Sequence, residues 1–351
     1  MRNNIKLTAI AIAITALLSA CGGNGSVPTK AVKPAPVPLP PAVVPGVVPG
    51  NLQVNVTPPP ATVSADVLDA FNALNDFRAS VGLGKLNYSP ELSVAAKNHQ
   101  TYNINPINFT LPTFPFSFHF ESSSGVGFTG YSPADRARFA GYATNNYVTE
   151  DGSTGANGKA ALFRLIETVY HRSSIAGQDY RDVGIDYLYQ PKVFRNGTIL
   201  PFGSLLLDIG YKTTPQRNAS DFYWAYPLND QTNVNLSMCG ETPFPFPEVD
   251  VDNACDLVGF PVSFIAEKSQ TLTVTKFTIK IAGTTTNLDA WLLTQKNDPN
   301  KNYLQANEAY LTAKGAMKPN TTYEVSFEGT INGKVVSKDW KFTTAAQQIF
   351  Y

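Results

Sequence analysis

Apolar residues recur at helical spacing in four segments between residues 64 and 175, and capping residues mark where the first three begin. The first segment follows Ser64 and stops near Gly82. Its apolar face consists of Val67, Phe71 and Leu74. The second and third segments begin with Ser-Pro, at Ser89 and Ser132, where serine caps the helix and proline takes its first position. We therefore predict three capped helices in this region.

The fourth segment, "NGKAALFRLIETVYHRSS", predicts one continuous helix. Its apolar face consists of Ala161, Leu162, Leu165 and Val169. Glu167 and His171 are four residues apart, so they would share one face of that helix. A carboxylate and an imidazole at this spacing can form half of a metal site or an acid–base pair. They can equally be ordinary polar residues near a helix end.

Strand patterns follow the helices. "DYRDVGIDYLYQP" and "SLLLDIGYKTT" are short and aliphatic, which predicts an α/β or α+β sandwich rather than a parallel doubly wound sheet. From about residue 256 the pattern is purely β. Asn332-Gly333 separates two alternating runs there, which predicts a hairpin within an all-β sandwich over 256–351. The predicted fold class is α+β, with an all-β domain at the C-terminus.

Composition indicates a globular protein. The chain has 351 residues, enough for two domains, and 27 basic residues balance 27 acidic ones. No run of Lys or Arg stands out, so the electrostatic footprint of a nucleic-acid binder is missing and we expect no nucleic-acid partner.

The N-terminus has the features of an export signal. Arg2 and Lys6 precede a short apolar run, and "LSAC" follows it. This arrangement resembles the lipobox of bacterial lipoproteins, in which Cys21 would become the lipidated first residue after removal of residues 1–20. Gly22 follows where Asp would usually direct retention in the inner membrane, so the resemblance implies an outer-membrane or cell-surface location. The alternative is an ordinary signal peptide with a chance cysteine.

A proline-rich segment and a cysteine pair organise the rest. Residues 21–60 are crowded with proline, which predicts an extended tether, or alternatively a ligand for a proline-binding partner. Cys239 and Cys255 are sixteen residues apart and, in an oxidising compartment, predict a disulfide. We interpret residues 216–255 as a linker that docks the two domains.

Residues 61–215 resemble the CAP superfamily, which comprises the cysteine-rich secretory, antigen 5 and pathogenesis-related 1 proteins and is also called the SCP domain. The resemblance rests on "FNALNDFRASVGLGKLNYSPELSVAAKNHQTY", "GFTGYSPADRARFAGY" and "HRSSIAGQDYRDVGIDY", which occur in the family's order. It implies an α–β–α sandwich. The C-terminal string "MKPNTTYEVSFEGTINGK" and the ending "WKFTT" resemble bacterial immunoglobulin-like modules.

The CAP resemblance implies a central cleft where two histidines and two acids converge. By motif position these are His119, Glu150, His171 and, as the second acid, Glu167. Two imidazoles and two carboxylates can hold a divalent metal such as zinc, with His119 and His171 as ligands, or can tune each other's pKa for proton transfer. Catalysis by the metal would require an open coordination position.

The sequence departs from the family pattern at the second acid. Family members commonly place it where Thr168 stands, one residue beyond the acid assigned above, and Glu121 is an alternative. Several residues also have a purely structural interpretation. His99 lies on the apolar stripe of its helix, so we expect a buried, hydrogen-bonded core histidine. His119 could pack within its aromatic run, and Glu150 could be a plain loop acid.

These features favour a surface-tethered binding module whose cleft holds a lipid, a sterol or a divalent metal, with an extracellular protein as another possible ligand. No GxSxG, HExxH or phosphate-binding motif is present, and the lack of a nucleophile motif argues against acyl-enzyme chemistry. One alternative is a metal-assisted or acid–base hydrolase of peptides or envelope polymer. Another is a structural, adhesive surface protein.

Overall fold

The computed structural model describes residues 50–108, 119–193 and 199–350. The signal peptide, Cys21 and most of the tether predicted from the sequence lie outside these residues. The helices are α1 Ala65–Ser80, α2 Pro90–Asn103, α3 Pro133–Phe139, α4 Gly158–Ile166, α5 Tyr170–Ile175 and α6 Ala254–Leu257, with the 3₁₀ helix η3 at Val251–Asn253. Within the described residues, every helix is too short or too polar to cross a membrane.

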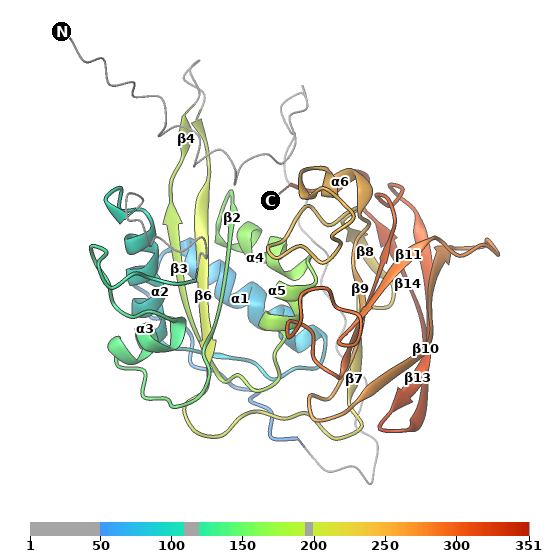
Figure 1. Cartoon of the computed structure of the whole chain (residues 1–351), viewed down its shortest axis with the longest axis horizontal. Coiled ribbons are helices and arrows are strands. Elements are labelled where there is room, and N and C mark those ends of the chain that lie inside the picture. The colour runs from blue at the N-terminus through green and yellow to red at the C-terminus, as the bar shows by residue number, and fades with distance from the viewer. Residues whose placement is uncertain (1–49, 109–118, 194–198, 351) are drawn as a thin grey trace.

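The N-terminal half is a three-layered sandwich (Figure 1). Its strands are β1 Asn87–Tyr88, β2 Thr149–Gly155, β3 Asp182–Tyr189 and β6 Gly203–Gly210, with a separate small ribbon of β4 Lys192–Val193 and β5 Ile199–Leu200. The main sheet has the order β1-β3-β6-β2, so β2 is an edge strand. Helices α2 and α3 cover one face, and α1, α4 and α5 cover the other (Figure 1). The predicted α+β class is confirmed.

The three predicted helix caps are present. Ser64 accepts a hydrogen bond from the Val67 amide, and Ser89 accepts one from the Leu92 amide. Ser132 and Asp135 form a reciprocal capping box at the start of α3, so both are explained by helix initiation.

The prediction of one continuous fourth helix is wrong. The chain forms α4 and α5 instead, separated at residues 167–169. Glu167 is the C-cap of α4, whereas His171 lies in the first turn of α5. The two residues therefore do not share one helix face. The Glu241 side chain stabilises this break from outside the two helices. Its carboxylate accepts hydrogen bonds from the Val169 and His171 amides at the start of α5.

The last part of the predicted tether packs on the domain. The Asn51 amide donates to the Arg217 carbonyl at 3.0 Å, and the Tyr88 amide donates to the Thr57 carbonyl at 2.9 Å. The side chain of Gln53 donates to the Lys85 and Arg181 carbonyls. Residues 50–57 thus belong to the folded unit, and any free tether must end before them.

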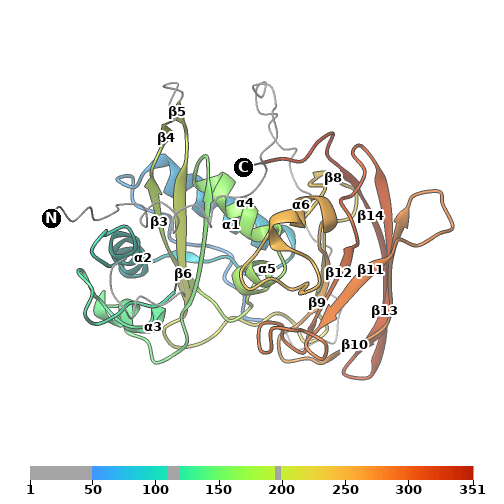
Figure 2. The same cartoon turned by 45° about the horizontal axis from the view of Figure 1, so that its top comes forward.

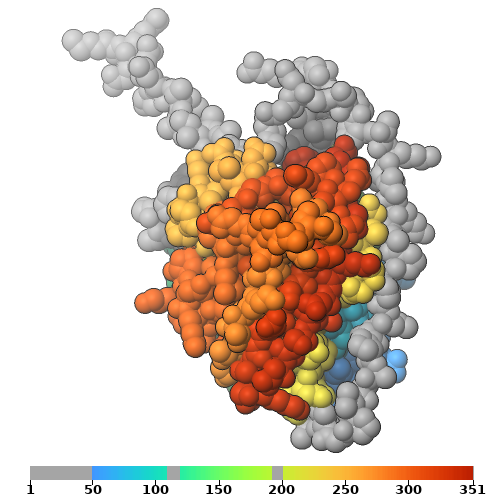
Figure 3. Space-filling view, turned by 90° about the vertical axis from the view of Figure 1, so that its right-hand side faces the viewer, coloured from blue at the N-terminus to red at the C-terminus, as the bar shows by residue number. Residues whose placement is uncertain are grey.

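The C-terminal half is a sandwich of two four-stranded sheets, which Figure 3 views from its outer side. Its strands are β7 Tyr223–Tyr226, β8 Gln231–Val234, β9 Val262–Ala266, β10 Leu272–Ile281, β11 Ala290–Thr294, β12 Glu308–Ala313, β13 Thr322–Ile331 and β14 Lys334–Thr344. The sheet orders are β10-β13-β14-β8 and β11-β12-β9-β7, and Phe264 stacks on Phe327 between them. Asn332 and Gly333 form the predicted hairpin turn, with φ of 47° and 79°.

Two of these strands come from the segment interpreted as a linker. β7 and β8 lie within residues 216–255, and each forms an edge of one sheet. The sandwich therefore begins at Tyr223 rather than at residue 256. The disulfide between Cys239 and Cys255 is present, as predicted.

Helix α5 joins the two halves, lying between the N-terminal sheet and strand β9 (Figure 2). The buried side chain of Arg172 donates to the Ile166 carbonyl at 2.6 Å and across the interface to the Pro261 carbonyl at 2.7 Å. Its guanidinium also lies over the Tyr226 ring, 4.8 Å from the centroid. Because these contacts are internal and polar, neither half can separate without leaving buried groups unpaired.

Replacing Arg172 should destabilise the whole protein. Arg172→Met would leave two buried carbonyls without donors, at about 1–3 kcal/mol each, so we expect a loss of about 2–5 kcal/mol in the free energy of unfolding measured with urea. The control is Arg138→Met, which removes a half-exposed arginine paired with Asp135 and should change stability by less than about 1 kcal/mol. Equal losses in the two variants would contradict the proposed role of Arg172.

Candidate functional site

The candidate site is built around two neighbouring acids on the edge strand β2. Glu150 and Asp151 are both buried, and successive residues of a strand point to opposite faces of the sheet. Glu150 therefore faces the layer of α2 and α3, and Asp151 faces the layer of α4 and α5. The site extends around the sheet edge from one layer to the other.

On the first face, Glu150 is surrounded by basic side chains. His119 Nδ1 lies 3.0 Å from one of its oxygens, and Arg136 donates to the other at 2.5 Å. His99 Nε2 lies 3.6 Å away. Burial alone would raise the pKa of Glu150, but the hydrogen bond from His119 and the charges of His99 and Arg136 outweigh it and hold the pKa at about 2. Glu150 is an ionised carboxylate at neutral pH.

His99 is the buried, hydrogen-bonded histidine that its position on α2 predicts. Its side chain is fully buried, and Nδ1 lies 2.9 Å from Glu121. Glu121 also accepts a hydrogen bond from the Thr129 amide at 2.8 Å. Glu121, the alternative second acid, thus pairs with His99 on the α2 side of the sheet.

Asp208 forms a buried acid pair with Glu150. The two residues are directly opposite each other on β6 and β2, so their side chains share one face. Neither carboxyl oxygen of Asp208 has a hydrogen-bond donor among the described residues. Burial, followed by the negative charge of Glu150, raises the pKa of Asp208 well above its usual value. Burial and the neighbouring Glu150 charge therefore favour the neutral form of Asp208.

On the second face, Asp151 accepts a hydrogen bond from the Ser174 hydroxyl at 2.7 Å. Burial raises the pKa of Asp151 to about 6, while the positive charges of His171 and His119 both act against this rise. Both histidines therefore act electrostatically on this one carboxyl group.

His171 pairs with an acid that the sequence did not suggest. Its Nδ1 lies 2.9 Å from Glu241, whose side chain is fully buried, and the His171 ring is 19% exposed. Burial disfavours the imidazolium, but the hydrogen bond and charge of Glu241, together with the charge of Asp151, raise the pKa of His171. Glu241 lies beyond β8, seventy residues from His171, so no helical spacing could point to it.

Glu167 has different partners. It accepts a hydrogen bond from the Asn235 side chain at 2.9 Å, at the end of α4. Of the four residues that the family resemblance implies, His119 contacts Glu150. Glu167 contacts Asn235, and the acid in contact with His171 is Glu241 instead.

The donor set does not form a ready three-ligand metal site. Within residues 50–108, 119–193 and 199–350, no group of three or more His, Cys, Asp or Glu side chains is placed to hold one ion. The zinc expected at His119 and His171 stays a prediction. An open hollow beside α3, lined by Tyr142 and Lys212 among others, contains none of the site residues.

The acid pair makes a prediction about pH. The folded-state pKa of Asp208 is raised, so its contribution to stability is full below its unfolded pKa of about 3.9 and declines as the pH rises. Asp208→Asn keeps a neutral hydrogen-bonding group and removes this titration. We expect the variant to gain stability relative to wild type as the pH rises above about 4, by up to about 1.4 kcal/mol for each pH unit that lies below the folded-state pKa of Asp208.

Urea unfolding at several pH values measures this difference. Asp289→Asn is the control, because Asp289 is 76% exposed and should show little change with pH relative to wild type. A difference between Asp208→Asn and wild type that is the same at pH 4 and pH 8 would show that Asp208 is not held protonated.

Comparison with known proteins agrees with this architecture. Residues 71–198 match the model of the cysteine-rich secretory protein family, CAP. No curated protein and no solved structure matches the chain. The family match supports a binding module in general and names no ligand. The segment of residues 71–198, which carries His119, Glu150 and His171, is a CAP domain.

Proposed function

We propose that the site binds a small ligand through the imidazoles of His119 and His171. The observation that carries this proposal is the pair of histidine–carboxylate contacts at the β2 edge. In each, a partly exposed ring meets a fully buried acid: His119 with Glu150 at 3.0 Å and His171 with Glu241 at 2.9 Å.

The chemistry of such a pair favours recognition. A carboxylate at Nδ1 keeps the proton on that nitrogen, so the other nitrogen, Nε2, is the acceptor of the neutral ring and has a fixed direction. The His119 side chain is 37% exposed and the His171 side chain 19%. Each ring therefore contacts a buried carboxylate on one side and is open to solvent on the other. Two rings held in this way can bind a hydroxyl, a phosphate or a metal ion.

Aromatic surface beside His119 favours an amphipathic ligand. Phe120 follows His119 in the chain and stacks on Tyr131, with ring centroids 4.8 Å apart. Tyr131 is itself 60% exposed. A lipid or sterol would place its apolar part on such rings and its polar head at the imidazoles. A divalent metal held by the two histidines is the alternative ligand, and an extracellular protein is a further one.

The proposed setting is an envelope surface. The features "LSAC" and the proline-rich segment support attachment through a lipidated Cys21 and a tether that ends before residue 50. A tethered module meets lipid and envelope components at high effective concentration.

A second candidate function is acid–base hydrolysis of peptides or envelope polymer. The observation that favours it is the His171–Glu241 contact, since a histidine oriented by a buried carboxylate is the usual arrangement of a general base. Turnover of a peptide or glycan substrate that disappears in His171→Gln would support this candidate. A purely adhesive role would be tested with surface substitutions in the full chain. Deleting residues 256–351 is not a suitable test, because it would also remove strand β9, which packs beside α5.

Binding to defined probes tests the proposed function. The probes are zinc chloride, phosphatidylglycerol vesicles and solubilised cholesterol, titrated into residues 50–351 by calorimetry or NMR. We expect wild type to bind at least one, and His119→Gln with His171→Gln to weaken that binding by roughly 10- to 100-fold, because each lost hydrogen bond costs about 1 kcal/mol.

The control is Lys276→Gln, on exposed strand β10, which should bind the probes like wild type. Unchanged binding in the folded double-histidine variant, or no binding of any probe to wild type, would reject this proposal.

A further inference from the structure

We infer that Glu241 is the second acid of the site: it lies outside the CAP domain and acts as the positioning residue for His171. The inference deepens the proposed function and rests on it for the role of His171. It also means that the C-terminal half completes the site, since Glu241 follows strand β8 of the sandwich.

One buried carboxylate binds both the backbone and the ring of His171. Oε1 of Glu241 accepts from the His171 amide at 2.8 Å and lies 2.9 Å from Nδ1 of the same residue. Oε2 accepts from the Val169 amide at 3.1 Å. Because the backbone and the ring of His171 are bound by the same oxygen, the direction of the imidazole is fixed relative to α5.

The residue at the expected acid position cannot do this. Thr168 contacts Nδ1 of His171 at 3.1 Å through its hydroxyl, which also donates to the Leu165 carbonyl at 3.0 Å. A hydroxyl brings no charge to the imidazole. Glu241 supplies that charge from a distant part of the chain.

The segment that carries Glu241 is tied to the CAP domain at two places. Asn235 donates to Glu167 at the end of α4, and Glu241 caps the start of α5, so the two contacts lie on either side of the helix break. The segment 235–241 thereby stabilises the separation of α4 from α5 that the helical pattern does not predict.

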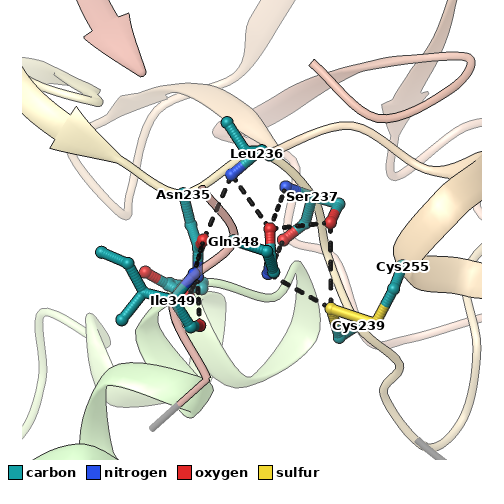
Figure 4. The surroundings of a disulfide bond; sticks show 8 residues. Asn235, Leu236, Ser237, Cys239, Cys255, Gln348 and Ile349 are labelled. Carbon is teal, nitrogen blue, oxygen red and sulfur yellow. Dashed lines mark hydrogen bonds between the residues drawn. A yellow bond between two sulfur atoms is a disulfide. The ribbon is translucent and has the colours of Figure 1, made fainter. Parts of the chain in front are cut away.

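A disulfide and the C-terminal residues hold this segment (Figure 4). Cys239, two residues before Glu241, is bonded to Cys255. Gln348 accepts from the Leu236 and Ser237 amides and donates to the sulfur of Cys239. Asn235 exchanges two hydrogen bonds with the backbone of Ile349. Glu241 is thus presented by a cross-linked scaffold.

The tautomer of His171 tests the inference. The chain has only three histidines, so each ring can be assigned in long-range ¹H–¹⁵N spectra of the full folded unit. Above its titration, wild-type His171 should carry its proton on Nδ1, directed at Glu241. In the Glu241→Gln variant, we expect the Nδ1–H form of His171 to be lost or to be mixed with the Nε2–H form. The variant retains Asp151, the other acid that acts on His171.

Glu167→Gln is the matched control, because it makes the same change at the acid that helical spacing favoured. It should leave the His171 tautomer as in wild type. Wild-type His171 in the Nε2–H form, or an equal effect of Glu167→Gln, would overturn the inference, and the wild-type spectrum decides even if Glu241→Gln does not fold. No ligand is needed, so failure here is distinct from failure of the proposed binding.

Discussion

The carboxylate of Glu241 at the start of α5 is the contact on which the candidate site depends. A six-residue helix has few internal hydrogen bonds, and α5 has no side-chain cap of its own. The buried Glu241 side chain binds two of its N-terminal amides and the His171 ring together. Without it, α5 would lose its cap and His171 its orientation.

The layered fold explains why the site can draw on both halves of the chain. β2 is an edge strand, so groups from either face of the sheet can meet around it. Glu150 gathers His119, Arg136 and His99 on one face, and Asp151 senses His171 from the other. Because α5 lies between this sheet and the sandwich, the same helix that carries His171 also carries the interface residue Arg172. The candidate site and the domain interface therefore share one helix.

The sequence predicts the parts of this arrangement that depend on local pattern. The structure contains the predicted capping serines, the Asn332-Gly333 turn and the disulfide. The caps and the turn depend only on neighbouring residues, and the disulfide depends on a single pair of cysteines. Two of the residues that the family resemblance implies, His119 and Glu150, lie in contact. The pairing of His171 is not predictable in this way, because a tertiary contact from residue 241 overrides the helical period that placed Glu167 beside it.

The boundaries show the same limit. Residues 216–255 look like a linker because β7 and β8 have four residues each and little alternation, yet both are completed by pairing with distant strands. Asp208 looks like one acid in an aliphatic strand, and only its register with Glu150 reveals the acid pair. Such features arise from pairing across the fold, which a single sequence does not contain.

Amide hydrogen exchange at Val169 and His171 tests the central claim most directly, because both amides donate to Glu241 in the native protein. If the C-terminal half builds this side of the site, these amides should open with the same free energy as amides of β9, Val262–Ala266, in the sandwich. Rapid exchange at both amides, like that of a fraying helix end, would contradict the account.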